Sequence, residues 1–350
     1  MSLKVGIVGL PNVGKSTLFK ALTKKAVDIS NYPFCTIEPN IGVVEVPDER
    51  LVKLSVFSKS AKTVPAVIEF VDIAGLVKGA SLGEGLGNKF LSHIREVDAI
   101  VQVVRVFPGE KITHVHNSVD PIRDIEIIET ELILADMDTV ANAEHRLEKE
   151  ARGQGKEAIA KLPILKILKT TLEAGGLATT AGLDWTDDTT RKLLAELQLL
   201  TAKPIFYAYN VADIGESLPA DLESRPHVKL DIKIEEELIE MSKEEAAELG
   251  IRSNLNELIV RAYALLGLMT YFTTGEDESR AWTIPVGSTA PEAGAAIHGD
   301  FEEKFIRAEV ISWEKLLAAG SYATGRERGW VRLEGKEYIV QDGDVIIFKI

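Results

Sequence analysis

The sequence predicts an α/β fold in which helices cover both faces of a mostly parallel sheet. Three observations support this class. Short β-branched apolar runs alternate with helical patterns in the N-terminal part, and this alternation breaks at residues 120–202, where the pattern is long, charged and helical. After residue 268 a Gly-rich loop and further strand patterns follow. We therefore expect a sheet domain, an inserted helical hairpin and a small β-rich domain.

Composition indicates a globular protein of two or three compact units. The chain has 350 residues, 45% of them hydrophobic, a mean hydropathy of +0.05 and a single cysteine, Cys35. We find no signal peptide and no apolar run of about 18 residues, so we expect a cytoplasmic protein with no membrane partner. A net charge of −14 repels nucleic acid on average. No DNA partner is expected, and RNA would need a local basic surface.

The strand and helix patterns of the predicted sheet domain begin near the N-terminus. Lys4 to Gly9 forms a β-branched run, and Lys15 to Thr23 follows as a helix. Further helical patterns cover Lys89 to Arg95, Glu235 to Glu248 and Leu255 to Leu268. The other strand candidates are Ile41 to Val46, Ala66 to Val71, Ala99 to Val106, Pro204 to Tyr209 and His227 to Ile232.

The middle of the chain predicts an antiparallel helical hairpin. Apolar residues recur at three- and four-residue spacing from about residue 120, and again from Ala158 to Glu173. Gly153 and Gly155 mark its tip, and a short helix is expected from Thr189 to Leu200. Near the C-terminus, Asp342-Gly343 is expected in a turn between two strands.

Charge is unevenly distributed along the hairpin. Residues 146–169 hold seven Lys or Arg and three acids, whereas residues 120–138 hold seven acids and one Arg. The basic stretch is either an RNA-binding surface or, together with the acidic one, a pair of solvated helix faces.

Residues Gly9 to Ser16 (GLPNVGKS) match the pattern G-x-x-x-x-G-K-[ST] between the first strand and the first helix. The glycines let the backbone curl so that successive N–H groups surround a phosphate. Lys15 is expected to reach the β- and γ-phosphates, which also face the positive end of the helix dipole. The Ser16 hydroxyl is expected to bind Mg²⁺. The chain is therefore predicted to bind a nucleoside triphosphate.

Two further segments complete this predicted site. Asp72 ends the strand that begins at Ala66, where a carboxylate holds Mg²⁺, and Gly75 three residues later lets an N–H approach the γ-phosphate. Between these motifs, Thr36 in the segment NYPFCTIEPN is expected to close over the nucleotide and to bind Mg²⁺. Gly75, Gly79, Gly83, Gly85 and Gly87 make a second loop with wide conformational freedom. Two loops that sense one phosphate predict a nucleotide-dependent switch.

A base-reading motif is expected after the strand that begins at Pro204. Asn210-Val-Ala-Asp213 stands where guanine-binding proteins usually have N-K-x-D, so Val211 replaces the lysine that covers the base. Asp213 would suit guanine and Val211 would not, which leaves the base open on chemistry alone.

With these motifs in place, the chain resembles the Obg-like ATPase (YchF) family of the translation-factor GTPase class. The resemblance extends over nearly the whole chain. It rests on GLPNVGKST (Gly9 to Thr17), NYPFCTIEPNIG (Asn31 to Gly42), DIAGLVKGASLGEGLGNKFL (Asp72 to Leu91), ITHV (Ile112 to Val115), DIEIIETELILADM (Asp124 to Met137), IHGDFEEKFIRAEV and YIVQDGDVIIF. Two departures are Asp213, where the family often has Glu, and Asp231-Ile-Lys233, where many relatives have S-A-K.

The resemblance implies a Ras-like P-loop domain (residues 1–120 and 203–268), an inserted helical domain (121–202) and a C-terminal β-grasp TGS domain (269–350). It also implies ATP hydrolysis in preference to GTP, with Mg²⁺ as cofactor and ribosomes (large or small subunit) and RNA as partners. The predicted nucleotide-binding residues are Asn12, Val13, Gly14, Lys15, Ser16, Thr17, Gly75, Asn210 and Val211, and the predicted metal ligands are Ser16, Thr36 and Asp72.

Catalysis needs a substitute for the glutamine that Ras-like enzymes place after D-x-x-G. Leu76 stands there and cannot orient water. The resemblance nominates His114, whose neutral imidazole could accept a proton from the water, so His114 and Lys15 are the predicted catalytic residues. Asn12 stands where related cation-dependent enzymes bind K⁺, so K⁺ is a second candidate cofactor.

Two alternatives to a slow ATPase switch stay open. One is a GTPase of the Obg or DRG kind, which Asp213 favours. The other is a nucleotide-gated adaptor for RNA or protein in which hydrolysis is incidental. The basic hairpin stretch and Arg326, Arg328 and Arg332 favour the adaptor.

Overall fold

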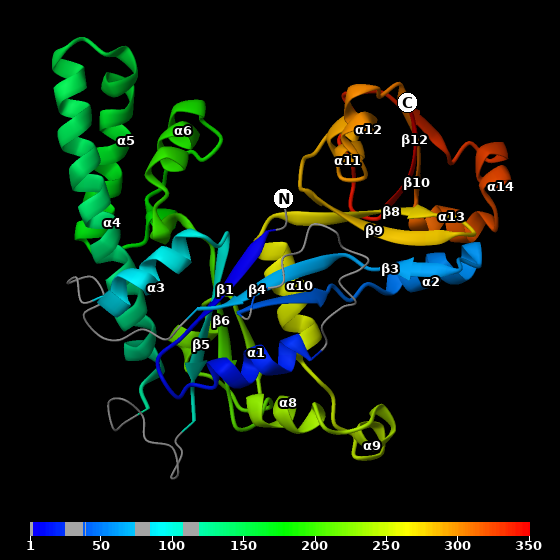
Figure 1. Ribbon diagram of the computed structural model, residues 1–350, viewed down its shortest axis with the longest axis horizontal. Coiled ribbons are helices and arrows are strands. Elements are labelled where there is room, and N and C mark those ends of the chain that lie inside the picture. Colours follow the sequence, from blue (N-terminus) through cyan, green and yellow to red (C-terminus); the bar gives the residue numbers. More distant parts are fainter. Residues whose placement is uncertain (1–2, 25–37, 39, 74–84, 108–118) are drawn as a thin grey trace.

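The computed structural model describes residues 3–24, 38, 40–73, 85–107 and 119–350. Two six-stranded sheets organise these residues, and a long helical arm projects from the first sheet (Figure 1). None of the described helices is both long and apolar enough to cross a membrane. The α/β class predicted from the sequence is confirmed.

The first sheet has the strand order β2-β4-β1-β5-β6-β7, and every neighbouring pair is parallel except β2 and β4. β5 is buried at each position, as expected for a central parallel strand covered on both faces. The strands are β1 (Lys4–Val8), β2 (Ile41–Glu45), β4 (Val67–Asp72), β5 (Ala99–Arg105), β6 (Ile205–Asn210) and β7 (His227–Leu230). All six were predicted, with ends that differ by one or two residues.

The helices around this sheet are α1 (Lys15–Thr23), α3 (Gly85–Arg95), α7 (Ala220–Glu223), α8 (Ile232–Leu238), α9 (Lys243–Glu248) and α10 (Leu255–Leu265). The single helix predicted from Glu235 to Glu248 is wrong. Ser242 starts a new helix through a reciprocal cap, in which Glu245 N donates to the Ser242 hydroxyl and Ser242 N to the Glu245 carboxylate at 2.8 Å. Gly85 and Gly87, which were expected in a loop, belong to α3.

The arm is an antiparallel pair, α4 (Pro121–Arg152) and α5 (Lys156–Glu173), as predicted. Asp120 accepts from Arg123 N at the start of α4, and Gln154 turns left-handed (φ 64°) between Gly153 and Gly155. The chain returns through η3 (Ala178–Thr180), α6 (Asp188–Leu197) and η4 (Leu200–Ala202). The helix predicted from Thr189 to Leu200 therefore ends earlier, because Gln198 turns left-handed (φ 47°).

Buried Asp136 on α4 holds this return segment in place. Its carboxylate accepts from Leu200 N, Thr201 N and the Thr201 hydroxyl at 2.6–2.9 Å. Burial raises the pKa of Asp136, and these three hydrogen bonds lower it again in part.

The second sheet has the order β11-β10-β12-β8-β9-β3. Its strands are β8 (Leu268–Thr274), β9 (Glu278–Pro285), β10 (Arg307–Ser312), β11 (Arg332–Glu334), β12 (Asp344–Lys349) and β3 (Lys62–Val64). The helices beside it are α2 (Glu49–Ser58), α11 (Ala290–Ala295), α12 (Gly299–Glu303), α13 (Trp313–Ala319) and α14 (Tyr322–Glu327). Gly343 lies just before β12 (φ 87°), whereas the strand expected before this turn is reduced to an isolated bridge at Ile339.

One edge strand of the second sheet comes from the N-terminal part of the chain. β3 pairs in parallel with β9, and Arg50 on α2 bridges Asp48 to Asp342 at 2.7 and 2.5 Å. Burial alone would lower the pKa of Arg50, but these two carboxylates raise it above its usual value. The segment that joins β2 to β4 is therefore built into the C-terminal sheet (Figure 1).

Candidate phosphate and metal site

The loop between β1 and α1 lies at the carboxyl edge of the first sheet. Its backbone is left-handed at Asn12 (φ 66°) and at Gly14 (φ 102°), and Leu18 N donates to Gly14 O at 2.9 Å as α1 begins. The first N–H groups of α1 have no acceptor within the helix. Together with the positive end of the helix dipole they make a site for a phosphate anion.

Two glycines let this loop approach the strands behind it. A Cβ on Gly9 would lie 2.9 Å from the Val103 carbonyl oxygen, and one on Gly14 would lie 2.8 Å from Asn210 Nδ2 and 3.0 Å from Ile232 Cδ1. Side chains at these positions would push the loop away from the sheet. Close packing against the sheet and α8 therefore explains why both glycines of the G-x-x-x-x-G pattern are needed in this chain.

Lys15 and Asp72 face each other across the site. Lys15 is the first residue of α1 and Asp72 the last residue of β4, and their side chains form an ion pair that is mostly shielded from solvent. Strand pairing places Asp72 opposite Ile7 on β1, one residue before that strand ends. Ser16 follows Lys15 on the exposed side of the same turn. The structure thus brings the predicted ammonium, hydroxyl and carboxylate to one edge of the sheet.

Asn210 braces the phosphate loop from behind. It is 8% exposed, donates through Nδ2 to the Val13 carbonyl at 2.9 Å, and accepts through Oδ1 from Ile232 N at 3.4 Å. Ile232 itself packs against Gly14. The sequence suggested a base-reading role for Asn210 but not this bracing contact, and it did not suggest Ile232 at all.

The other two positions of the base-reading motif differ in their surroundings. The Val211 side chain is 2% exposed and packs in an apolar cluster with Tyr207, Tyr209 and Leu222. Asp213 is exposed and accepts from Gly215 N at 2.8 Å, which makes a local turn. Thr17 is half-buried on α1. Three predicted site residues, Thr36, Gly75 and His114, lie outside the described residues.

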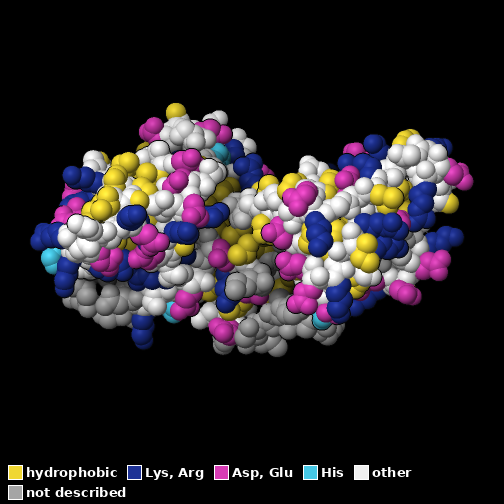
Figure 2. Space-filling view, turned by 90° about the horizontal axis from the view of Figure 1, so that it is seen from above, with side chains coloured by type: hydrophobic (Ala, Val, Ile, Leu, Met, Phe, Trp, Pro, Cys, Tyr) yellow, Lys and Arg dark blue, Asp and Glu magenta, His cyan; other side chains and the backbone are white. Residues whose placement is uncertain are grey.

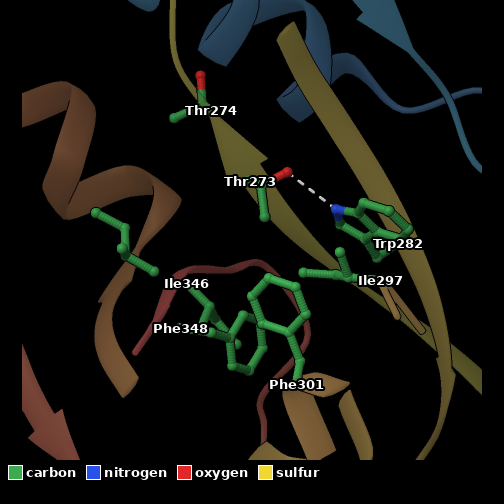
Figure 3. Close-up of a pocket in the computed structure, with 8 residues that line it drawn as sticks. Thr273, Thr274, Trp282, Ile297, Phe301, Ile346 and Phe348 are labelled. Atoms are coloured by element: carbon green, nitrogen blue, oxygen red, sulfur yellow. Dashed lines mark hydrogen bonds between the residues drawn. The ribbon is translucent and has the colours of Figure 1, made fainter. Parts of the chain in front are cut away.

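A hollow lies in the C-terminal part, away from the phosphate loop (Figure 3). Its volume is about 300 Å³, and Thr273 accepts there from Trp282 Nε1 at 2.9 Å. The Thr274 hydroxyl already bonds to Ser58 and Ser279. The lining residues are Thr273, Thr274, Trp282, Ile297, Phe301, Ile346, Ile347 and Phe348, none of which is ionisable. This hollow therefore offers no acid or base.

The strand-loop-helix unit with Lys15, Ser16 and Asp72 defines the class of this chain as a P-loop nucleoside triphosphatase. A family model described as a 50S ribosome-binding GTPase matches residues 4–160. A second, YchF-GTPase_C, described as a protein of unknown function (DUF933), matches residues 268–350.

Comparison with whole proteins narrows the class to a family. The chain is 52% identical to the ribosome-binding ATPase YchF of Bacillus subtilis strain 168, covering 100% of this chain and 99% of that protein. It is 48% identical to the protein of the same name from Escherichia coli O157:H7, covering 99% of each. The solved structure of the Schizosaccharomyces pombe YchF GTPase superposes with a TM-score of 0.87 at 38% identity, covering 99% of this chain and 98% of that one. The chain belongs to the YchF family.

Proposed function

We propose that this chain is a slow Mg²⁺-dependent ATPase of the cytoplasm whose nucleotide state controls its binding to the ribosome. The observation that carries the proposal is the placement of Lys15 and Asp72, which lie together at the carboxyl edge of the parallel sheet and at the start of a helix. The names of the relatives support both the ATPase activity and the ribosome binding, because the bacterial proteins at 48–52% identity are called ribosome-binding ATPases. Ribosomal subunits and RNA are the proposed partners.

The donor set suits Mg²⁺ bound with nucleotide. Magnesium prefers six oxygen ligands and usually takes only one or two from the protein, the others being water and phosphate. Ser16 and Asp72 supply such a small oxygen set, and we propose Thr36 as a third ligand. No group of three or more His, Cys, Asp or Glu in the described part of the chain could hold a metal by itself. When bound, the ion would neutralise charge that develops on the transferred phosphoryl group.

The residues of this chain would then act on the phosphates. The N–H groups of Asn12 to Thr17 would bind the phosphate oxygens, Lys15 would stabilise the charge between the β- and γ-phosphates, and Gly75 would contribute a further N–H. Asp72 now pairs with Lys15. A triphosphate would therefore have to draw the ammonium away from this carboxylate, which would free Asp72 for the metal.

The base contact favours ATP over GTP. Recognition of guanine by this motif usually needs a lysine that covers the base and a free aspartate. Val211 is buried and cannot supply a cation, and one oxygen of Asp213 is engaged with Gly215 N. The alternative is a GTPase of the Obg or DRG kind. Side-by-side titration and turnover with ATP and GTP separate the two, and tighter binding and faster turnover with GTP would contradict our choice.

For activation of water we propose His114, since Leu76 offers no hydrogen bond. His114→Ala should abolish hydrolysis while ATP binding is kept, and equal turnover in that variant would remove His114 from the mechanism. Asn12 is a proposed K⁺ ligand. Equal turnover in K⁺ and Na⁺ would contradict that part of the proposal.

The adaptor alternative loses part of its support on the arm. Four of the seven basic residues of the stretch 146–169 are in ion pairs: Arg146 and Lys161 with Glu196, Lys169 with Glu144 and Arg152 with Glu148. Arg326 and Arg332 of the C-terminal sheet are paired as well, with Glu309 and with Glu334. A hydrolysis-dead variant that kept the cellular role would restore this alternative.

We propose the domain limits 1–120 with 203–268, 121–202 and 269–350. Separate buried clusters in the arm and in the C-terminal sheet support them. Strand β3 is the exception, since residues 62–64 pair with β9 across the proposed limit.

A further inference from the structure

Helix α5 of the arm has two apolar faces. One face is buried against the rest of the arm and consists of Ala158, Leu165, Leu168 and Leu172. The other is exposed and carries Ile159, Pro163 and Ile167 at four-residue spacing, with the two isoleucines 53% and 45% exposed. Helical residues four apart lie one above the other on the same face. These three side chains therefore form a continuous ridge, and Figure 2 shows hydrophobic side chains gathered on the arm.

Two lysines border the ridge, and the carboxylate of Glu173 follows on the same side of the helix beyond Thr170. Lys156, three residues before Ile159, and Lys166, three residues after Pro163, lie on the same side of the helix. Both are exposed, and neither takes part in any ion pair within the described ranges, unlike Arg146, Lys161 and Lys169 of the same arm. Among the seven basic residues of the stretch 146–169, those without an ion pair in the described ranges are Lys149 on α4 and the two lysines that border the ridge.

The spacing along this face fits a partner helix. Ile159, Pro163 and Ile167 recur every four residues along two turns of the helix, and Lys156 and Lys166 lie beside them, so this face offers an apolar stripe with cations at its border. Pro163 has no N–H to donate to the Ile159 carbonyl, so this carbonyl lacks its usual helical donor. RNA would use the cations but has no apolar stripe to cover two isoleucines. An acidic amphipathic protein helix would use both.

We propose that the exposed face of α5, formed by Lys156, Ile159, Pro163, Lys166 and Ile167, docks an acidic amphipathic helix of a ribosomal protein. This inference rests on the ribosome binding proposed above and identifies the kind of ribosomal component that the arm recognises. The apolar stripe of the partner would pack on the two isoleucines, and its carboxylates would pair with the two lysines.

The test compares binding of the full-length protein to purified ribosomes in the presence of ATP and Mg²⁺, measured by co-sedimentation. The variants are Ile159→Ser with Ile167→Ser, and Lys156→Glu with Lys166→Glu. The matched control is Leu249→Ser with Val260→Ser, which replaces apolar residues that are 64% and 44% exposed, the first in the turn after α9 and the second on α10. Because the changed side chains are exposed, all variants should keep their thermal unfolding midpoint and their ATPase rate without ribosomes.

We expect the isoleucine pair to weaken ribosome binding on the order of tenfold or more, the lysine pair to weaken it also, and the control to leave it unchanged. Wild-type binding with an unaffected isoleucine variant would overturn the docking face. So would equally tight binding to protein-free ribosomal RNA with a loss only in the lysine variant, which would identify RNA as the occupant. A wild-type dimer that the isoleucine variant dissolves would identify a second copy instead. If the wild type failed to bind ribosomes at all, the proposed function itself would be refuted.

Discussion

Gly14→Ala tests how the phosphate loop is held against the sheet. Alanine at φ 102° would adopt a left-handed backbone that costs about 1–2 kcal/mol. Its Cβ would also lie 2.8 Å from Asn210 Nδ2, so Asn210 would have to move and its hydrogen bond to the Val13 carbonyl would weaken. That loss adds about 1 kcal/mol. We therefore expect a fall of about 2–3 kcal/mol in the free energy of unfolding, measured by urea denaturation.

A double-mutant cycle separates the two causes. In Asn210→Ala the nearest clashing atom is absent, so adding Gly14→Ala should cost the backbone strain of about 1–2 kcal/mol together with the contact to Ile232 Cδ1 that remains in both backgrounds. The two substitutions should therefore be non-additive by about 1 kcal/mol, and the affinity for a fluorescent ATP analogue should fall in each single variant. Strict additivity, or a Gly14→Ala protein as stable as the wild type, would refute the close packing described here.

Two further predictions concern contacts that hold the parts of the chain together. Arg50→Ala should lower the free energy of unfolding by about 1–2 kcal/mol, a value discounted for solvent screening because Asp342 is 52% exposed. The control is Arg191→Ala, which removes an exposed ion pair on α6. An unchanged urea midpoint in Arg50→Ala would contradict the bridging role. Asp136→Ala should cost about 3 kcal/mol because two buried N–H groups and a hydroxyl lose their acceptor, whereas Asp138→Ala, exposed on the same helix, should cost less than about 0.5 kcal/mol. Equal destabilisation in the two aspartate variants would refute that account.

The sequence predicted the first sheet and its phosphate loop well because each has a strong local signal. Strands such as Ala99 to Val106 are continuous apolar runs, and the Gly9 to Ser16 pattern stands between a strand and a helix. The pairing of β3 with β9 had no such signal. A three-residue strand is too short to show periodicity, and its partner lies more than 200 residues away.

The break between α8 and α9 does have a local signal in the sequence. Ser242 and Glu245 form the S-x-x-E pattern that starts a helix, although the helical pattern from Glu235 to Glu248 predicts one continuous helix. The bracing of the phosphate loop by Asn210 and Ile232 depends on tertiary packing, so no local pattern could show it. The sequence also does not separate the two apolar faces of α5, because the apolar residues of both faces together follow a single helical spacing of three and four residues.

The central claim is that Lys15 and the N–H groups at the start of α1 hold a triphosphate. Calorimetric titration of Mg²⁺ and ATP into the wild type and into Lys15→Met tests it most directly. We predict saturable binding to the wild type and a loss of affinity on the order of a hundredfold or more in the variant, because a charge-assisted contact to the β- and γ-phosphates is removed. Equal affinity of the two proteins, or no heat of binding with either ATP or GTP in the wild type, would contradict it.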